Sequence, residues 1–588
     1  MPARRFAAAF LALLACAAPA RALELQLAAD GLHDEEATQA RAAMDEVARA
    51  LPRHWADALG AVRVEWRDDL PADVHGRARG DRILLRRALL ADADGHAARA
   101  ALVHELAHLY DRSAAGGLSR DPRLLDLAGW QDAPLRPWRT RNRFTDRSPD
   151  LYELESPAEF VAVNLEYYLL DDSYPCRRPQ LARHFDAAFG EPRAHAPCPP
   201  GLPFVQFDAT ATPSAPLLEL DPARVYAVDY LLAEGNERPM SRWGHSMLRL
   251  VVCAPGRAPG PDCRLDLDWH LVLSFRAFVD DVQVSSWRGL TGSYPSRLFL
   301  LPLAQVVDEY TKVELRGLRS IPLRLHPEEV AMLLQRAARL HWSYDGRYYF
   351  IGNNCAVETA RLLADGVPGL HAADLMSITP GGLLRRLDAA GVVDASVLDD
   401  RDRAIRLGYY FPPASARYQA MFDVARAALE LPQRDVREWM ALPAGDRAAV
   451  FEAAGLRASA ALLLLEEAAL RRLQLEARDV LKRHMPDVAR DGAGGLLAIE
   501  DLLTRPAQLA PDGYGLPQPA ERRAIGPEAT ALAARWQGQR DALFAQARGW
   551  LPAHRQAALE AVEGNVAVLG SRLRELHRAA GGLELSGH

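Results

Sequence analysis

The sequence of 588 residues lacks a long apolar segment outside its N-terminus, so we expect no transmembrane segment in the mature chain. A later run of leucines, Leu462–Leu465, leads directly into two glutamates. An excess of basic residues is also missing, because 70 Lys and Arg stand against 77 Asp and Glu and the formal net charge is −7. Nucleic acid is therefore not an expected partner. The sequence shows no internal repeat and does not indicate an oligomeric state.

The N-terminal residues have the features of a targeting signal. A short basic stretch and the apolar run Phe6–Ala18 lead to an A-x-A motif at residues 20–22. This order is typical of a secretory signal peptide, which we expect to be cleaved after Ala22. A lipobox ending at Cys16 is the alternative, but Leu14 fits that pattern poorly. Together with the high content of Ala, Arg and Leu, the signal predicts a periplasmic or secreted bacterial protein.

Cysteine is scarce, and its spacing is informative. Removal of the signal peptide leaves five of the six cysteines. In an oxidising compartment, cysteines that are close in sequence pair with each other. We therefore expect two disulfides, Cys176 with Cys198 and Cys253 with Cys263. Cys355 remains as a free thiol, which is either buried and inert or a reactive group.

The length predicts two to four domains, and the pattern of apolar residues predicts a multidomain α+β protein. We expect a signal peptide at residues 1–22, an α+β domain at 23–190, a second domain containing strands at 205–410 and an all-α domain at 415–588. Strands are predicted at Val62–Trp66, Arg224–Leu232, Ser246–Cys253, Asp266–Phe275, Val282–Ser286 and Val313–Arg316. Helices are predicted at Asp34–Leu51, Pro327–Arg339, Cys355–Ala364, Ser415–Leu429, Arg434–Leu442, Gly445–Met485, Pro527–Leu551 and Ala557–Ala580, with a long loop near Asp491–Ile525.

A helix with two histidines carries the clearest chemical signal. The segment Ala101–Asp111 contains no Gly or Pro and places His104 and His108 four residues apart, on one helical face. Two imidazoles at this spacing can bind one zinc ion, and Glu105 between them can act as general base toward water. The alternative is a helix with two surface histidines. The apolar neighbours of the motif favour a buried active-site helix.

A third zinc ligand is expected from a second helix, which begins near Pro157 with Ser156 as a possible N-cap. Glu155, Glu159 and Glu166 lie near one face of this helix, and helical geometry alone does not choose among them.

The two helices together resemble the gluzincin-type zinc peptidases, especially the lethal-factor-like group. The resemblance rests on H-E-x-x-H followed some fifty residues later by E-F-x-A. In that pattern the Glu before Phe is the ligand, which here is Glu159. The resemblance implies a zincin-like fold for residues 23–190, and implies that Asp81–Leu85 is the edge strand that binds the substrate.

A second set of residues places Asn354 at a helix N-cap and Cys355 in the first helical turn. The free N–H groups at a helix start favour a thiolate and can bind an oxyanion. His245, at the start of an apolar strand, is the candidate base. A thiol beside this imidazole should have a lowered pKa.

The order of histidine on a strand and cysteine opening a helix resembles circularly permuted papain-like folds of the NlpC type. A fuller resemblance, over about residues 226–370, is to the Lnb N-terminal periplasmic domain family. It rests on the motifs Trp243–His245, Asp308–Tyr310, Glu314–Arg316 and Tyr349–Cys355. The family implies Cys-His acyl transfer, which in its named member moves a fatty acyl chain onto lipoprotein amino termini. This chain departs from that member because it lacks membrane helices.

A third group should orient His245, and His270 is a candidate because it lies on the next predicted strand. If Cys253 and Cys263 faced each other across a hairpin, residue 245 would be opposite Leu271. His270 would then point to the other face of the sheet unless a bulge intervened.

These patterns lead to two hypotheses. The first is an exported envelope protein that combines a zinc peptidase-like site with a Cys-His hydrolase or acyltransferase-like domain, and that acts on a peptide, acyl or lipoprotein substrate. The second is a non-catalytic envelope scaffold in which one or both sites have decayed. Zinc binding distinguishes them, because a scaffold with a dead site has no need to retain the metal.

Overall fold

The computed structural model describes residues 23–71, 73–132, 138–141, 147–206, 216–236, 242–277, 294–344, 346–350, 352–490, 506–509 and 512–581. The predicted signal peptide, the predicted strand Val282–Ser286 and much of the predicted loop near Asp491–Ile525 lie outside these residues. The chain divides into two compact units. The first contains Met1–Gln131 and Ser148–Pro199, and the second contains Asp132–Arg147 and Pro200–His588.

The first unit contains a four-stranded sheet with the order β1-β2-β4-β3. Its strands are β1 (Glu24–Ala28), β2 (Ala61–Arg67), β3 (Gly76–Arg79) and β4 (Arg82–Arg86). The strands β1, β2 and β4 are parallel, and β3 is an antiparallel edge strand. The expectation of an edge strand at Asp81–Leu85 is therefore wrong. A tight turn at Gly80, whose φ is +60°, folds β3 back along the outer side of β4.

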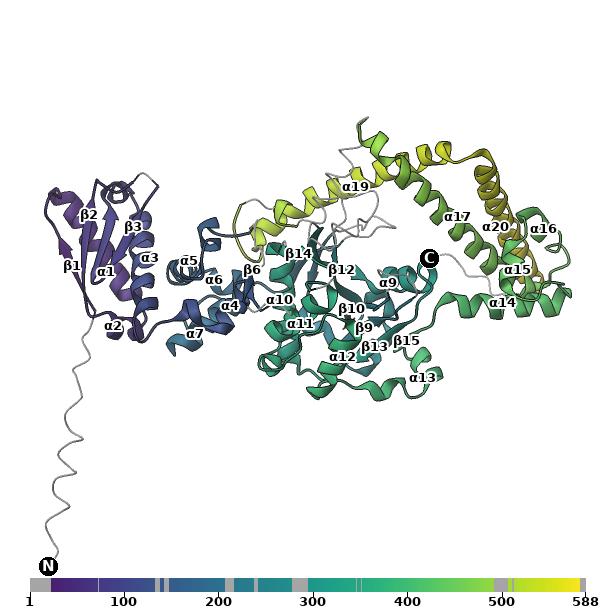
Figure 1. The fold of residues 1–588 in the computed structure, drawn as a ribbon, viewed down its shortest axis with the longest axis horizontal. Coiled ribbons are helices and arrows are strands. Elements are labelled where there is room, and N and C mark those ends of the chain that lie inside the picture. The colour runs from purple at the N-terminus through teal and green to yellow at the C-terminus, as the bar shows by residue number, and fades with distance from the viewer. Residues whose placement is uncertain are drawn as a thin grey trace, which may run out of the picture. The chain divides into compact units, whose positions relative to one another are not determined.

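Helices cover one face of this sheet and leave the other exposed. Alternate residues of β2 and β4 are buried and pack toward α1 (Asp34–Ala50) and α3 (His96–Arg112). They are Val62, Val64, Trp66, Ile83 and Leu85. Figure 1 shows α1 and α3 beside the strands of this unit. The unit also contains α2 (Arg53–Leu59), α4 (Pro122–Leu127), α5 (Pro157–Leu170), α6 (Tyr174–Arg177) and α7 (Pro179–Phe189).

The second unit is built on a seven-stranded antiparallel sheet with the order β14-β12-β11-β10-β9-β13-β15. Figure 1 shows helices packed around these strands. The strands are β9 (Val225–Ala233), β10 (His245–Val252), β11 (Leu271–Ala277), β12 (Tyr294–Pro302), β13 (Leu318–Pro322), β14 (Gly346–Tyr348) and β15 (Tyr410–Phe411). A separate pair is formed by β7 (Leu202–Val205) and β8 (Leu217–Leu220).

The two faces of the large sheet pack against different helices. On one face Met247 and Val272 pack with Val306 and Tyr310, which belong to α9 (Leu303–Val307) and to a π-helical turn, η8 (Asp308–Val313). On the other face lie α10 (Pro327–Ser343), α11 (Cys355–Gly366) and α12 (Pro380–Ala389). Contacts on that face include Ser296 with Glu358 of α11, and Tyr230 with Pro380 of α12.

Two details of the second unit differ from the expectation. The predicted strand Val313–Arg316 is wrong, because this segment follows the π-helical turn and the strand begins at Leu318. The register considered for the next pair of strands also differs: β10 and β11 are antiparallel neighbours, but short 3-10 helices lie in the connection between them. Leu250 pairs with Leu271, so residue 245 is not opposite Leu271.

The C-terminal region is helical, as predicted, and has its own core. Its helices are α14 (Ala414–Leu429), α15 (Val436–Ala441), α16 (Ala444–Ala448), α17 (Leu456–Arg490), α19 (Pro519–Trp550) and α20 (Ala553–Ala579). Buried residues such as Phe422, Trp439, Leu462 and Leu569 form one cluster that joins α14, α15, α17 and α20. None of the helices in the described residues is both long and apolar enough to span a bilayer.

Candidate metal centre and candidate thiol site

The two histidines of the H-E-x-x-H motif lie in the middle of α3 and point toward α5. The apolar side chains of α3 on either side of the histidines, Leu102, Val103, Leu106 and Ala107, are all fully buried. This environment holds the helix in place and leaves the imidazoles partly accessible, with 16 and 10% of their side-chain surfaces exposed. The predicted burial of this helix is confirmed.

Glu159 supplies the carboxylate that faces both imidazoles. Ser156 caps α5 and Pro157 occupies its first turn, as predicted, and this places Glu159 in the first turn. Its Oε2 lies 3.2 Å from His104 Nε2 and 3.1 Å from His108 Nε2. The three ligand atoms all lie within 4.8 Å of one another, which is close enough for one metal ion to contact all three. Two imidazole nitrogens and one carboxylate are a donor set that suits a catalytic zinc ion.

Glu105 lies between the metal-binding face of α3 and the edge strand β3. Burial raises the pKa of its carboxyl group, which suits a general base. A Cβ atom added at Gly76 would lie only 2.7 Å from Glu105 Cγ, so the strand passes the carboxylate without a side chain between them. The Ala78 main-chain N–H also interacts with this carboxylate. Glu105 is thus fixed at the open edge of the sheet.

Two further residues next to the histidines were not assigned from the sequence. Glu166 lies two helical turns after Glu159, and its Oε2 is 3.6 Å from His104 Nδ1. A carboxylate in this position favours the proton on Nδ1 and leaves Nε2 for the metal. The ring of Tyr152 lies 6.2 Å from the ring of His104. The spacing of Glu159 and Glu166 along one helix was the available signal for Glu166.

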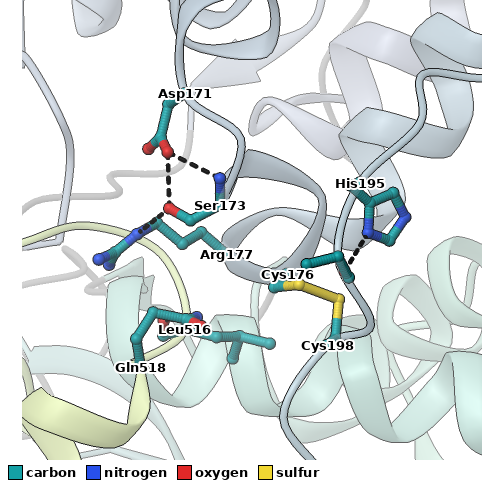
Figure 2. The surroundings of a disulfide bond; sticks show 9 residues. Asp171, Ser173, Cys176, Arg177, His195, Cys198, Leu516 and Gln518 are labelled. Atoms are coloured by element: carbon teal, nitrogen blue, oxygen red, sulfur yellow. Dashed lines mark hydrogen bonds between the residues drawn. A yellow bond between two sulfur atoms is a disulfide. The ribbon is translucent and has the colours of Figure 1, made fainter.

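A second possible metal cluster does not have the necessary chemistry. Cys176, His195 and Cys198 lie close together in the first unit. Figure 2 shows that the two sulfur atoms are bonded to each other, with His195 beside them. Sulfur in a disulfide is not a thiolate ligand, so this cluster is a crosslink. The structure has both predicted disulfides, and the second joins Cys253 to Cys263.

Cys355 is a free, buried thiol at the start of α11. The Asn354 side chain accepts hydrogen bonds from Ala356 N and Val357 N, which confirms the predicted N-cap. The Cys355 main-chain N–H donates to the Tyr348 hydroxyl over 3.3 Å. Burial raises the pKa of the thiol and outweighs Ser246 and Tyr348, whose nearby groups act to lower it. The expected lowering of this pKa is therefore not found in this structure.

His245 is the first residue of β10, and its side chain lies on the face of the sheet that carries Ser274 and Tyr310. Its Nε2 is 3.1 Å from Ser274 Oγ, and its ring stacks on the ring of Tyr310. Burial, together with the positive charges of Arg276 and Arg316, lowers the pKa of His245 to about 3. The imidazole is therefore neutral at physiological pH.

The structure does not bring His245 and Cys355 together. Neighbouring residues of a strand point to opposite faces. Ser246, the next residue, is the one that interacts with Cys355, whereas His245 contacts residues on the side of α9 and η8. Their pairing stays a prediction, and it requires a different side-chain position for His245.

His270 belongs to a buried polar network, and both of its ring nitrogens have partners there. Nδ1 accepts hydrogen bonds from Arg249 and Nε2 donates to the Cys263 carbonyl. Arg264 makes a bidentate ion pair with Asp229, and Ser320 links Asp229 to Arg249. In this structure His270 holds the disulfide-containing loop against the sheet and has no contact with His245 that the described residues show.

The elements define a multidomain mixed α/β protein with a helical C-terminal region. Residues 211–390 match the model of the Lnb N-terminal periplasmic domain, which confirms the resemblance found for the second unit. Residues 24–117 and 113–198 match the model of a domain of unknown function, DUF7844. No curated protein and no solved structure matches the chain. The periplasmic domain match and the two disulfides are consistent with an exported envelope protein.

Proposed function

We propose that the first unit is a zinc-dependent peptide hydrolase of the bacterial cell envelope, with a zincin-like fold over residues 23–190. The observation that carries this proposal is the convergence of His104 Nε2, His108 Nε2 and Glu159 Oε2, with Glu105 beside them. This is the ligand set of a catalytic zinc site, in which one coordination position stays open.

The chemistry follows from the positions of these side chains. When bound, zinc would polarise a substrate carbonyl and make water more acidic. Glu105 takes a proton from the attacking water and delivers it to the nitrogen of the departing amine. Glu166 orients His104 through Nδ1, and the open edge of β3 offers main-chain groups to an extended peptide.

Zinc content and peptide hydrolysis of the mature full-length chain test the proposal. We expect about one zinc ion per chain, and we expect His108→Ala to remove it because two remaining ligands hold zinc poorly. His96→Ala is the matched control, since His96 is an exposed residue of the same helix. Glu105→Gln should keep the metal and abolish hydrolysis. Stoichiometric zinc in His108→Ala would place the metal elsewhere, and a chain without zinc would favour the scaffold hypothesis.

A second proposed activity belongs to the second unit, for which we infer a permuted papain-like fold over residues 205–410. Cys355 at the start of α11, hydrogen-bonded through its N–H to Tyr348, supports a thiol that forms a thioester with an acyl or peptide substrate. His245 is the proposed base, provided that its side chain leaves Ser274 and turns toward Cys355. The resemblance of this region to the Lnb N-terminal periplasmic domain supports acyl transfer.

A further inference from the structure

The exposed face of the sheet in the first unit is rich in arginine. The inward residues of β2 and β4 are apolar, so the outward positions of β2, β3 and β4 meet solvent. Six arginines occupy these positions, namely Arg63, Arg67, Arg77, Arg79, Arg82 and Arg86.

Most of these arginines already have partners within the protein. Glu65 lies 3.1 Å from Arg63, 3.7 Å from Arg67 and 4.0 Å from Arg82. Arg67 also pairs with Asp69, and Arg86 donates to two main-chain carbonyls. Carboxylates of the chain therefore neutralise much of the charge on β2 and β4.

Arg77 and Arg79 of β3 are different. Both are exposed, and neither makes a hydrogen bond or ion pair within the described part of the chain. Because Arg79 is paired in register with Arg82, three guanidinium groups lie near this end of the sheet. Two positive charges without protein partners remain on one short strand.

That strand is the one that borders the proposed catalytic base. Gly76 lies directly against Glu105, and the Ala78 N–H interacts with its carboxylate. On its other side β3 has no neighbouring strand among the described residues. A peptide paired to this edge would run beside Glu105, and its outward side chains would lie next to Arg77 and Arg79, since side chains on one face of neighbouring strands are in contact.

We propose that Arg77 and Arg79 make this site selective for peptide substrates with acidic side chains close to the cleaved bond, an inference that rests on the proposed peptide hydrolase. The two arginines bind carboxylates on the outward face of the substrate strand, while Glu105 acts at its edge. An anionic lipid surface is the competing partner for a basic face. An acidic peptide is favoured over a lipid surface as the partner, because the unpaired arginines lie on the strand next to Glu105. Arg63 and Arg67 lie two strands further away and are neutralised by carboxylates of the chain.

The test measures binding separately from hydrolysis. The zinc-loaded full-length Glu105→Gln variant is titrated against two fluorescent peptides that are identical except that one carries Glu where the other carries Gln. We expect the Glu peptide to bind more tightly, and the double variant Arg77→Glu with Arg79→Glu to weaken it about tenfold while leaving the Gln peptide nearly unchanged. The preference should shrink in high salt. Arg41→Glu, at an exposed position on α1, is the control and should have no effect.

The outcomes separate the two proposals. Equal affinity for the two peptides would overturn the inference, as would an unchanged preference in the double variant. Binding to phosphatidylglycerol vesicles that disappears in the double variant, without a peptide preference, would assign the arginines to a membrane surface and also overturn it. If the Glu peptide binds selectively but the zinc-loaded wild type never cleaves it, the role of Arg77 and Arg79 in binding acidic peptides stands, whereas the proposed hydrolase fails.

Discussion

Arg249 Nη2 donates a hydrogen bond to His270 Nδ1 over 2.8 Å, deep in the second unit. His270 Nε2 in turn donates to the Cys263 carbonyl, so the ring is held as one neutral tautomer. Both groups are fully buried, and the loop closed by the second disulfide depends on them. In this structure both ring nitrogens of His270 are used in this network, and its role in orienting His245 stays a prediction.

The neutral His270 makes stability dependent on pH. Burial and the charge of Arg249 lower the pKa of His270 to about 4, from an ordinary value of 6.5. Between these values the unfolded chain binds a proton that the folded chain does not. The free energy of unfolding therefore falls as the pH drops through this window, by an amount on the order of 1–3 kcal/mol.

His270→Gln tests this dependence by urea unfolding at several pH values from 7.5 to 4. The stability advantage of wild type over the variant should shrink as the pH falls. His96→Gln, at an exposed position, should show a constant difference. A difference that does not change with pH for His270→Gln would contradict a neutral, buried ring.

Glu166 should strengthen zinc binding without being a ligand. Removing its charge weakens the interaction between Glu166 Oε2 and His104 Nδ1. Loss of a group that orients a metal ligand typically lowers metal affinity about 10–100-fold. We expect Glu166→Gln to lower zinc affinity in this range and Glu159→Gln to lower it much further. Glu155→Gln is the matched control, because Glu155 is exposed and precedes α5. A competition titration with a zinc chelator measures all three. Equal losses for Glu159→Gln and Glu166→Gln would contradict the distinction between ligand and orienting residue, and a larger loss for Glu166→Gln would reverse it.

The rate at which Cys355 is alkylated should depend on Tyr348 and not on His245. Because burial raises its pKa, we expect slow alkylation by iodoacetamide at pH 7 and faster reaction at alkaline pH. Tyr348→Phe removes a hydroxyl that acts to lower this pKa, and should shift the pH midpoint of alkylation upward. His245→Ala should leave the midpoint unchanged as long as the imidazole stays on the other face. A marked slowing at pH 7 in His245→Ala would instead show that the two residues act as a pair.

The helical C-terminal region should depend on one buried ion pair. Glu466 is fully buried and accepts hydrogen bonds from Arg447 Nε at 2.5 Å, Arg447 Nη2 at 3.0 Å and Asn565 at 3.0 Å. Glu466→Gln leaves Arg447 as an uncompensated buried charge, which typically costs 3–5 kcal/mol. The adjacent, exposed Glu467 is the control, and Glu467→Gln should change stability by less than about 0.5 kcal/mol. Thermal unfolding followed by circular dichroism compares the two.

Local patterns in the sequence predict much of the cluster of possible metal ligands, because helix geometry fixes the relative positions of its two histidines. The spacing of His104 and His108 places them on one face whatever surrounds the helix. The choice of Glu159 over Glu155 and Glu166 needed more than geometry, and it came from the resemblance. The two disulfides could be predicted because cysteines that are close in sequence can pair without depending on the rest of the fold.

Which face of the sheet each strand residue of the second unit points to could not be predicted in this way. A shift of one residue in register moves a side chain to the opposite face, and the register of β10 against β11 depends on how the chain between Cys253 and Cys263 folds. Short 3-10 helices lie in this connection and set a register other than the one considered from the sequence. Tyr348 and Ser246 were missed next to Cys355 because tertiary packing, with no sequence spacing to signal it, brings them to α11.

Residues 132–147 leave the first unit and belong to the second, and the chain then returns to the first. Within the second unit, the fully buried Arg147 is bound to the carbonyls of Asp512 and Gly515 and to the carboxylate of Glu521. A fragment cut at Pro199 would therefore separate Arg147 from its acceptors, which lie more than 360 residues further along the chain, and would leave Glu521 in the other piece without this partner. Residues 132–147 of such a fragment would lack the unit to which they belong, and co-expression of the two pieces would supply it in trans, which makes fragment complementation an assay for this crossing of the chain.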